Sequence, residues 1–232
     1  MKPLLYLTSV LCVLLGSFSQ AKSQTEDNPV YVRSIGILAG TQGVGVTFSV
    51  PFQDHLALRA GAAFLPFDTD VLKTYNNYKT TNDITARLSN VHLLVDWTPF
   101  DDHDNFGKHF ALSTGMGLFY KARGTFVTKL TEPYQYGEIV VAPEDIGVLT
   151  TSIDWDFSLA PYLGLGLQNF NLGPKIGLDF NLGAYYLNKP DVRIVGTNLL
   201  DGNEANAQIV EENVKKYRFL PVAQLSLSYK IK

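Results

Sequence analysis

The last fifteen residues, RFLPVAQLSLSYKIK (218–232), alternate between apolar and mostly polar side chains. From Phe219 to Ile231 every second residue is apolar, and the positions between them include Gln224, Ser226 and Ser228. A period of two residues is typical of a β-strand with one apolar face. The run is about twice as long as an ordinary strand of ~5–6 residues. Its apolar face must therefore lie against a large core or against an apolar environment outside the protein.

Seven further segments repeat this alternation and predict an all-β fold of eight antiparallel strands. In most of them Leu, Val, Ile or an aromatic residue alternates with Gly, Ala, Ser or Asn. The predicted strands span residues 30–40, 44–52, 55–64, 90–97, 109–123, 157–168, 175–187 and 218–232.

The predicted connections alternate between short and long. Those at residues 51–55, 99–108 and 169–174 are short and rich in Pro, Asp, Asn and Gly, whereas those at 67–81, 128–156 and 188–216 are long. Up-and-down membrane barrels have short turns at one end and longer loops at the other. The even strand number places both termini at the end with the short turns. A hairpin within residues 128–156 would raise the strand number from eight to ten.

The first residues predict a secretory leader. Lys2 precedes an apolar run from Leu4 to Leu15 that is too short for a membrane-spanning helix of roughly 20 residues. Cleavage after Ala21 or Ser23 divides the chain into a signal peptide (1–23) and an exported barrel domain (24–232).

The charge content is low, and no second run of 18 apolar residues follows the leader, so no membrane-spanning helix is expected. Charged residues make up 18% of the chain and the net charge is −3. This balance provides no positive field for nucleic acid, so no such partner is expected.

The less apolar faces of the predicted strands are mainly Gly, Ala, Ser, Asn and Gln. A soluble, lipocalin-like barrel would present a highly charged face to water, whereas small residues with few charges fit the interior of a narrow barrel. Charged side chains in such an interior are expected to form ion pairs and hydrogen bonds with one another. We therefore predict a polar network that acts as a structural plug. Alternatively, this network lines a narrow path for ions or small solutes. The predicted members of this network are Arg59, His92, Asp96, Lys121, Arg123 and Asp179.

Aromatic residues on the apolar faces predict two girdles at the ends of the strands. Along two strands the aromatic pairs are ten residues apart, which corresponds to roughly 25 Å along the barrel axis, the height of a lipid-facing band. One predicted girdle contains Phe64, Tyr120, Phe157, Tyr186 and Phe219, and the other contains Phe52, Trp97, Phe110 and Tyr229. The apolar faces are therefore predicted to contact lipid.

Four segments resemble the small bacterial outer-membrane β-barrel proteins. They are GTQGVGVTFSVPFQDHLALRAG, APYLGLGL, GLDFNLGAYYLNKPDVRI and VEENVKKYRFLPVAQLSLSYKI. The resemblance implies an outer-membrane location, with both termini in the periplasm, and recognition of the last strand by the barrel-assembly machinery. That signal normally ends in an aromatic residue, and this chain departs from it by ending in Tyr229-Lys230-Ile231-Lys232.

No residue set predicts catalysis or cofactor binding, and we expect the protein not to be an enzyme. The densest polar cluster, Asp101, Asp102, His103, Asp104 and His109, has the chemistry of a metal site or of an Asp/His protease pair, but the predicted topology favours a solvated periplasmic turn. His109 and Ser113 share a predicted face, yet roughly 13 Å of strand separates them. The GTQGVG segment lacks the glycine order of a nucleotide loop.

The long loop near the C-terminus predicts one short helix. Asn203 is a candidate cap, and Ala207, Val210, Val214 and Tyr217 repeat on one helical face. This helix is expected to cover the outer mouth or to face an extracellular partner. The leading hypothesis is a plugged outer-membrane barrel with a structural or surface-interaction role. The alternative is a passive channel for a small or hydrophobic solute; an outer-membrane hydrolase or acyltransferase is less favoured.

Overall fold

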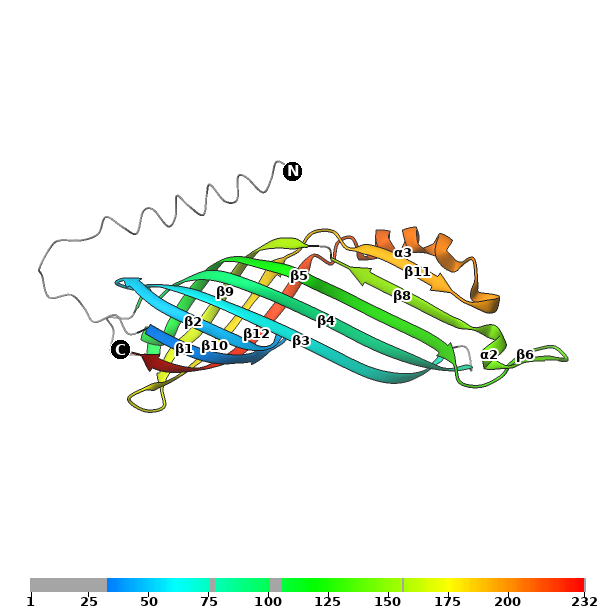
Figure 1. Cartoon of the computed structure of the whole chain (residues 1–232), viewed down its shortest axis with the longest axis horizontal. Coiled ribbons are helices and arrows are strands. Elements are labelled where there is room, and N and C mark those ends of the chain that lie inside the picture. The colour runs from blue at the N-terminus through cyan, green and yellow to red at the C-terminus, as the bar shows by residue number, and fades with distance from the viewer. Residues whose placement is uncertain (1–32, 76–77, 101–105, 156, 232) are drawn as a thin grey trace, which may run out of the picture. The chain divides into compact units, whose positions relative to one another are not determined.

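Eight antiparallel strands close into a ring in the computed structural model, which describes residues 33–75, 78–100, 106–155 and 157–231. Consecutive ring strands pair with one another, β5 pairs with β9, and β12 pairs with β1 to complete the closure (Figure 1). The predicted eight-stranded barrel is thus confirmed. Its strands are β1 (Arg33–Gly40), β2 (Gly43–Gln53), β3 (Leu56–Tyr75), β4 (Tyr78–Trp97), β5 (Phe110–Leu130), β9 (Ser158–Asn171), β10 (Ile176–Tyr186) and β12 (Phe219–Ile231). The predicted leader lies outside the described residues.

The side chains of the ring alternate as the sequence predicts, with apolar residues outward. In β9, Leu159, Leu163 and Leu165 are 52%, 63% and 51% exposed, whereas Ala160 and Tyr162 between them are buried. The interior of an eight-stranded ring is just wide enough for its own side chains. This narrow interior explains why many of the inward residues are small. The ring has a terminal end, where β1 begins and β12 ends, and a distal end opposite to it.

Three ring strands continue beyond the distal end, where they form an extension of the same sheet. β3 and β4 have 20 residues each and stay paired from Leu65 and Leu88 to Tyr75 and Tyr78. The prediction of a long loop at residues 67–81 is therefore wrong, since most of this segment is strand. The segment gave no strand signal because polar residues fall on both of its faces.

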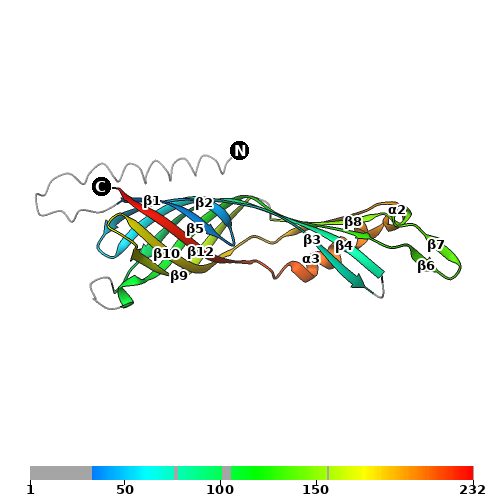
Figure 2. The same ribbon diagram turned by 90° about the horizontal axis from the view of Figure 1, so that it is seen from below.

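Two further strands extend this sheet alongside β5 (Figures 1 and 2). β8 (Val148–Asp154) pairs with β5, and β11 (Asp191–Gly196) pairs with β8. We call the distal parts of β3, β4 and β5, together with β8 and β11, the outer sheet. The hairpin of β6 (Tyr134–Tyr136) and β7 (Ile139–Val141) forms a sheet of its own, so it adds no strands to the ring.

The helices are short. They comprise α2 (Pro143–Ile146), α3 (Ala207–Val214) and the 3₁₀ turns η2 (Phe106–His109), η3 (Asn198–Leu200) and η4 (Asn203–Asn206). The predicted helix near the C-terminus is confirmed as α3, but Asn203 does not cap it, since its side-chain amide donates to the carbonyl of Leu200 at 2.7 Å. α3 packs against β11 of the outer sheet rather than over the mouth of the ring. No helix in the described part of the chain is long and apolar enough to cross a membrane.

Candidate functional site: the barrel interior

A buried ion pair joins β3 to β4 inside the ring. Arg59 and Asp96 are 6% and 3% exposed, and the guanidinium donates from Nε and Nη2 to the two carboxylate oxygens, each at 2.8 Å. Ser113 of β5 donates to Asp96 at 2.5 Å and accepts from Arg59 at 3.2 Å. Three neighbouring strands are thus tied together by one charged cluster. Both carboxylate oxygens are occupied, as the cost of burying a charge requires.

A second polar cluster lies closer to the distal end. The amide of Asn90 donates to Gln42 at 3.0 Å, and its oxygen contacts Nδ1 of His92 at 3.2 Å. The side-chain amide of Gln42 donates to the Gln224 side-chain oxygen, and the Gln224 amide donates to Ser226 at 3.0 Å. These contacts run across the interior from β4 to β12. They satisfy polar groups that an empty lumen would leave to water.

Aromatic side chains fill the interior at the distal end. Phe119 and Tyr185 are both fully buried and meet edge to face, with ring centroids 5.1 Å apart, and Tyr162 packs on Tyr185 at 4.7 Å. We call this set, with Leu94, Ala122, Ala160, Leu187 and Val222, the aromatic plug. Gly117 makes room for it, since a Cβ there would lie 2.5 Å from the Tyr185 ring. The interior is therefore closed by apolar packing as well as by polar contacts.

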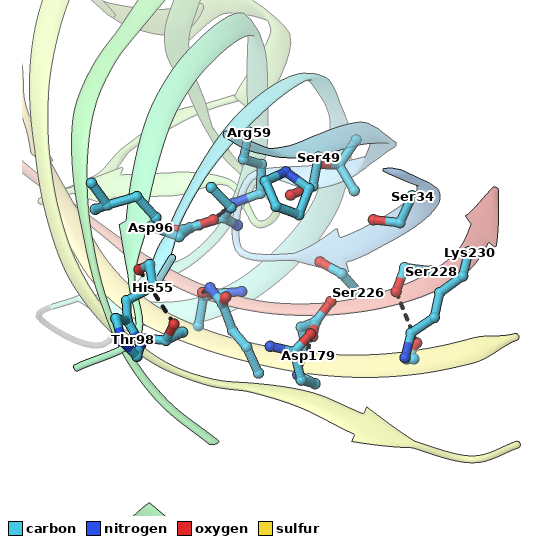
Figure 3. A pocket seen from close by; sticks show the side chains of 18 of the residues that line it. Ser34, Ser49, His55, Arg59, Asp96, Thr98, Asp179, Ser226, Ser228 and Lys230 are labelled. Atoms are coloured by element: carbon cyan, nitrogen blue, oxygen red, sulfur yellow. Dashed lines mark hydrogen bonds and ion pairs between the residues drawn. The ribbon is translucent and has the colours of Figure 1, made fainter. Parts of the chain in front are cut away.

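A polar cavity of about 250 Å³ lies between the ion pair and the terminal end (Figure 3). Asp179 stands in its wall and accepts the backbone N–H of Asn169 at 2.8 Å, where a bulge in β9 gives Asn169 a φ of 63°. Asn181, also in the wall, is buried, and its side-chain nitrogen has no hydrogen-bond partner among the described protein groups. Hydroxyl and charged side chains complete the lining, among them Ser34, Ser49, Ser226, Ser228 and Lys230. The cavity can hold a small polar solute.

The structure brings only part of the predicted polar network together. Arg59, His92 and Asp96 lie in the interior, and Asp179 lies in the cavity wall.

The inward placement of Lys121 and Arg123 is wrong. A bulge at Tyr120 shifts the alternation of β5: Ser89 pairs with Lys121, but Asn90 pairs with Phe119. Ala122 then faces the plug, so its two neighbours point away from the interior, and Arg123 pairs with Asp154 of β8.

The aromatic residues of the predicted girdles lie on the outward face of the strands. All except Phe110, which is half-buried, are exposed. The five predicted for the distal rim, such as Phe64 and Phe219, lie at or next to the strand positions that end the ring there. Two separate aromatic rims therefore border the apolar outer face.

The predicted turn cluster cannot be assembled from the described residues, because Asp101, Asp102, His103 and Asp104 lie outside them. His109 is described: its ring stacks on Phe170 with centroids 4.1 Å apart, and Nδ1 contacts the Gln168 carbonyl oxygen at 2.8 Å. Ser113 instead belongs to the ion-pair cluster. Within the described ranges, no group of three or more His, Cys, Asp or Glu side chains is arranged to hold a metal.

The aromatic plug is what sequence reasoning missed. Tyr162, Tyr185 and Phe119 all have the phase of inward residues, since the bulge in β5 lies beyond Phe119, but nothing in the alternation showed that their rings would meet. Glycines on the inward faces of neighbouring strands provided a usable signal. Added Cβ atoms at Gly164 and Gly183 would each lie 2.4 Å from the Tyr162 hydroxyl.

These features define a closed, eight-stranded, antiparallel up-and-down β-barrel whose interior is largely filled by side chains. No protein-family model matches the chain, and no curated protein matches its sequence. Two crystal structures share the fold at low identity. CarO from Acinetobacter baumannii is 19% identical, with a TM-score of 0.63 over 90% of this chain and 100% of that one. CarO2 from the same organism is 16% identical, with a TM-score of 0.64 over 88% and 100%. A major outer membrane protein from Thermus thermophilus matches at 16% identity over 88% and 100%, with a TM-score of only 0.40.

Proposed function

We propose that this chain is an integral protein of the bacterial outer membrane with a structural or surface-interaction role exerted through its outer sheet. One observation carries the proposal: large apolar side chains are exposed on the outward face of the ring while the interior is closed. Contiguous apolar surface of this extent is unfavourable in water and marks contact with lipid or another apolar partner. Exposed members on different strands include Ile37, Val46, Leu93, Leu163, Leu182 and Leu225.

The aromatic rims support a membrane placement. Trp and Tyr favour the headgroup region, and the apolar band of membrane barrels lies between two such girdles. With the terminal end in the periplasm, the outer sheet stands outside the cell. The C-terminal strand β12 would then be the segment that the barrel-assembly machinery reads, and membrane lipid is the partner of the ring.

The closed interior favours a non-catalytic role outside the barrel. The most deeply buried charges, Arg59 and Asp96, are paired with each other. The outer sheet instead offers accessible apolar side chains on the proposed extracellular side. Leu72, for example, is 73% exposed, and Phe67 and Val195 are also exposed. Such a surface suits contact with an extracellular partner or a neighbouring envelope component.

Single-channel recording in planar bilayers tests this proposal. The purified protein, with folding confirmed by a heat-dependent gel shift, is expected to insert without steady conductance. The Phe119→Ala/Tyr185→Ala variant removes the two fully buried aromatic side chains of the plug and is expected to give conductance steps. Steps in the variant would show that the silent wild type is inserted but plugged. Steady steps in the wild type would refute a closed barrel, and failure to insert would refute the membrane placement.

Passive transport of a small solute is the second candidate, and the polar cavity favours it. The cavity reaches Arg59, and Asn181 in its wall carries an unpartnered donor, so a polar solute has groups to contact there. On this alternative the wild type conducts and Arg59→Ala enlarges the steps.

A further inference from the structure

A shallow apolar groove of about 620 Å³ runs along the outward face of β5, β9 and β10. Its lining consists only of apolar side chains and glycine, including Leu112, Leu163, Leu165, Phe180, Leu182 and Ala184. Ala184 pairs with Leu163, and it is the smallest of the outward residues of β10. A groove without polar side chains fits a hydrocarbon chain.

A cationic rim stands directly beyond the distal end of this groove. The next outward residue after Ala184 is Tyr186, and the Arg218 guanidinium lies over its ring, 4.2 Å from the centroid. Arg218 is held there because its Nε donates to the Leu187 carbonyl at 2.9 Å. Phe219 also packs against Tyr186, with ring centroids 5.0 Å apart. The exposed Lys121 lies at the same rim on β5.

Neither cation has a carboxylate within ion-pair distance among the described residues. A fixed guanidinium with free donors is a favourable partner for a phosphate, because its fork makes two parallel charge-assisted hydrogen bonds. Apolar lining below and positive charge above is the pattern that an amphiphile with an anionic headgroup complements.

We propose that the groove and its rim bind one phosphorylated glycolipid of the outer leaflet, of the lipid A class. An acyl chain lies in the groove beside Ala184, and one phosphate meets Arg218. A second phosphate meets Lys121, which stands at the same rim on β5 with β9 and β10 between it and β12. The inference rests on the proposed membrane function, since the distal end is the outer-leaflet side only in that orientation.

The terminal rim provides a matched control. Lys175 lies over the ring of Tyr229 at 5.7 Å, so the same kind of cation stands on an aromatic residue at the opposite end of the ring. Replacing Lys175 with Gln therefore changes the charge by the same amount without touching the proposed site.

Native mass spectrometry of the purified protein during a lipid titration tests the proposal. One lipid A molecule is expected to bind the wild type, in preference to phosphatidylglycerol and to the same glycolipid without phosphates. Arg218→Gln and Lys121→Gln are each expected to weaken binding about fivefold, and the double variant about 25-fold. Ala184→Leu, which fills the groove, is expected to weaken it as well, whereas Lys175→Gln leaves it unchanged.

Equal affinity for the three lipids, or full binding by the double variant, would overturn the proposal. A wild-type dimer that Ala184→Leu converts to a monomer would also overturn it, because a second copy would then occupy the groove. Both results can be obtained with a protein that inserts into bilayers. Failure of insertion instead contradicts the proposed function itself, so the two failures are distinguishable.

Discussion

The buried ion pair inside the ring gives the most quantitative prediction. In Arg59→Met, Asp96 keeps its hydrogen bond from Ser113 but loses both contacts with the guanidinium while it stays 3% exposed. Removing one partner of a buried pair leaves an uncompensated charge and costs about 3–5 kcal/mol. We expect the free energy of unfolding to fall by about that amount. Asp96→Leu should cause a similar loss, because the Arg59 guanidinium would stay buried without its carboxylate partner.

The double variant Arg59→Met/Asp96→Leu should behave differently from the sum of the single changes. Apolar replacement of a whole buried pair is often neutral or stabilising by about 1–4 kcal/mol, because no charge remains in the interior. The coupling energy of the double-mutant cycle is therefore expected to be several kcal/mol.

Urea unfolding in lipid vesicles measures these changes, with the heat-dependent gel shift as a second readout and Trp97, adjacent to Asp96, as a fluorescent probe. Arg87→Met is the matched control, because Arg87 also contacts both carboxylate oxygens of an aspartate, Asp68, at 2.9 and 2.8 Å, but on the exposed outer sheet. Solvent screens that pair, so its loss should matter little. If Arg59→Met costs no more than Arg87→Met, or if the cycle is additive, the reasoning fails.

Three further predictions concern the plug, the outer sheet and the helix. Gly117→Ala should lower the free energy of unfolding by about 1–3 kcal/mol, because the added Cβ would clash with the Tyr185 ring. Gly124→Ala on the same strand should not, because the nearest atom would be 3.8 Å from its Cβ. Urea titration compares the two variants, and equal losses would contradict the packing argument. The hydrogen bond from Arg87 holds the pKa of Asp68 below its ordinary value, so this contact stabilises the β3–β4 hairpin above the ordinary carboxyl pKa and is lost as pH falls through the lowered one. Hydrogen exchange of the hairpin amides should show that loss, and Arg87→Gln should remove it; an unchanged pH profile in the variant would count against it. Replacing α3 with a flexible linker should leave the gel shift of the ring intact while exposing β11 to protease, because the helix contacts β11; loss of the gel shift would show that the helix supports the ring.

The ring could be predicted from sequence because its two faces differ in chemistry along every strand. An apolar outward face and a small or polar inward face produce an alternation that no helix shares. The long strand β12, with Leu225 and Leu227 outward and Gln224 and Ser226 inward, shows it most clearly. The turn residues between the predicted strands supported the same strand boundaries. One of these turns lies at His55, which has a φ of 63° in the structure.

The outer sheet could not be predicted in the same way. Polar residues fall on both faces of the distal part of β3, where Asp68, Asp70 and Lys73 interrupt any apolar period. β8 joins the sheet by pairing with β5, and β11 joins it by pairing with β8. The pattern within a single strand does not contain such non-local contacts.

The bulge in β5 explains why the inward placement of Lys121 and Arg123 was wrong. Phe119 and Tyr120 are both aromatic, so the sequence shows no break where the phase changes. Strict alternation carried beyond Tyr120 turns Lys121 and Arg123 inward, although the chain turns them outward.

The two-zone interior explains why a barrel with a polar cavity can still be closed. The cavity and the ion pair lie toward the terminal end, where charged and hydroxyl groups satisfy one another. The aromatic plug lies toward the distal end, where Tyr185 is wedged between Phe119 and Tyr162 and Gly117 sits against its ring. Tyr185 is fully buried, so a change of its rotamer would have to displace Phe119 or Tyr162. Opening a path would thus require this packing to be disrupted. A solute that enters the cavity from the terminal end meets a barrier at the plug, which favours the proposed role at two outer surfaces, the apolar outward face of the ring and the outer sheet.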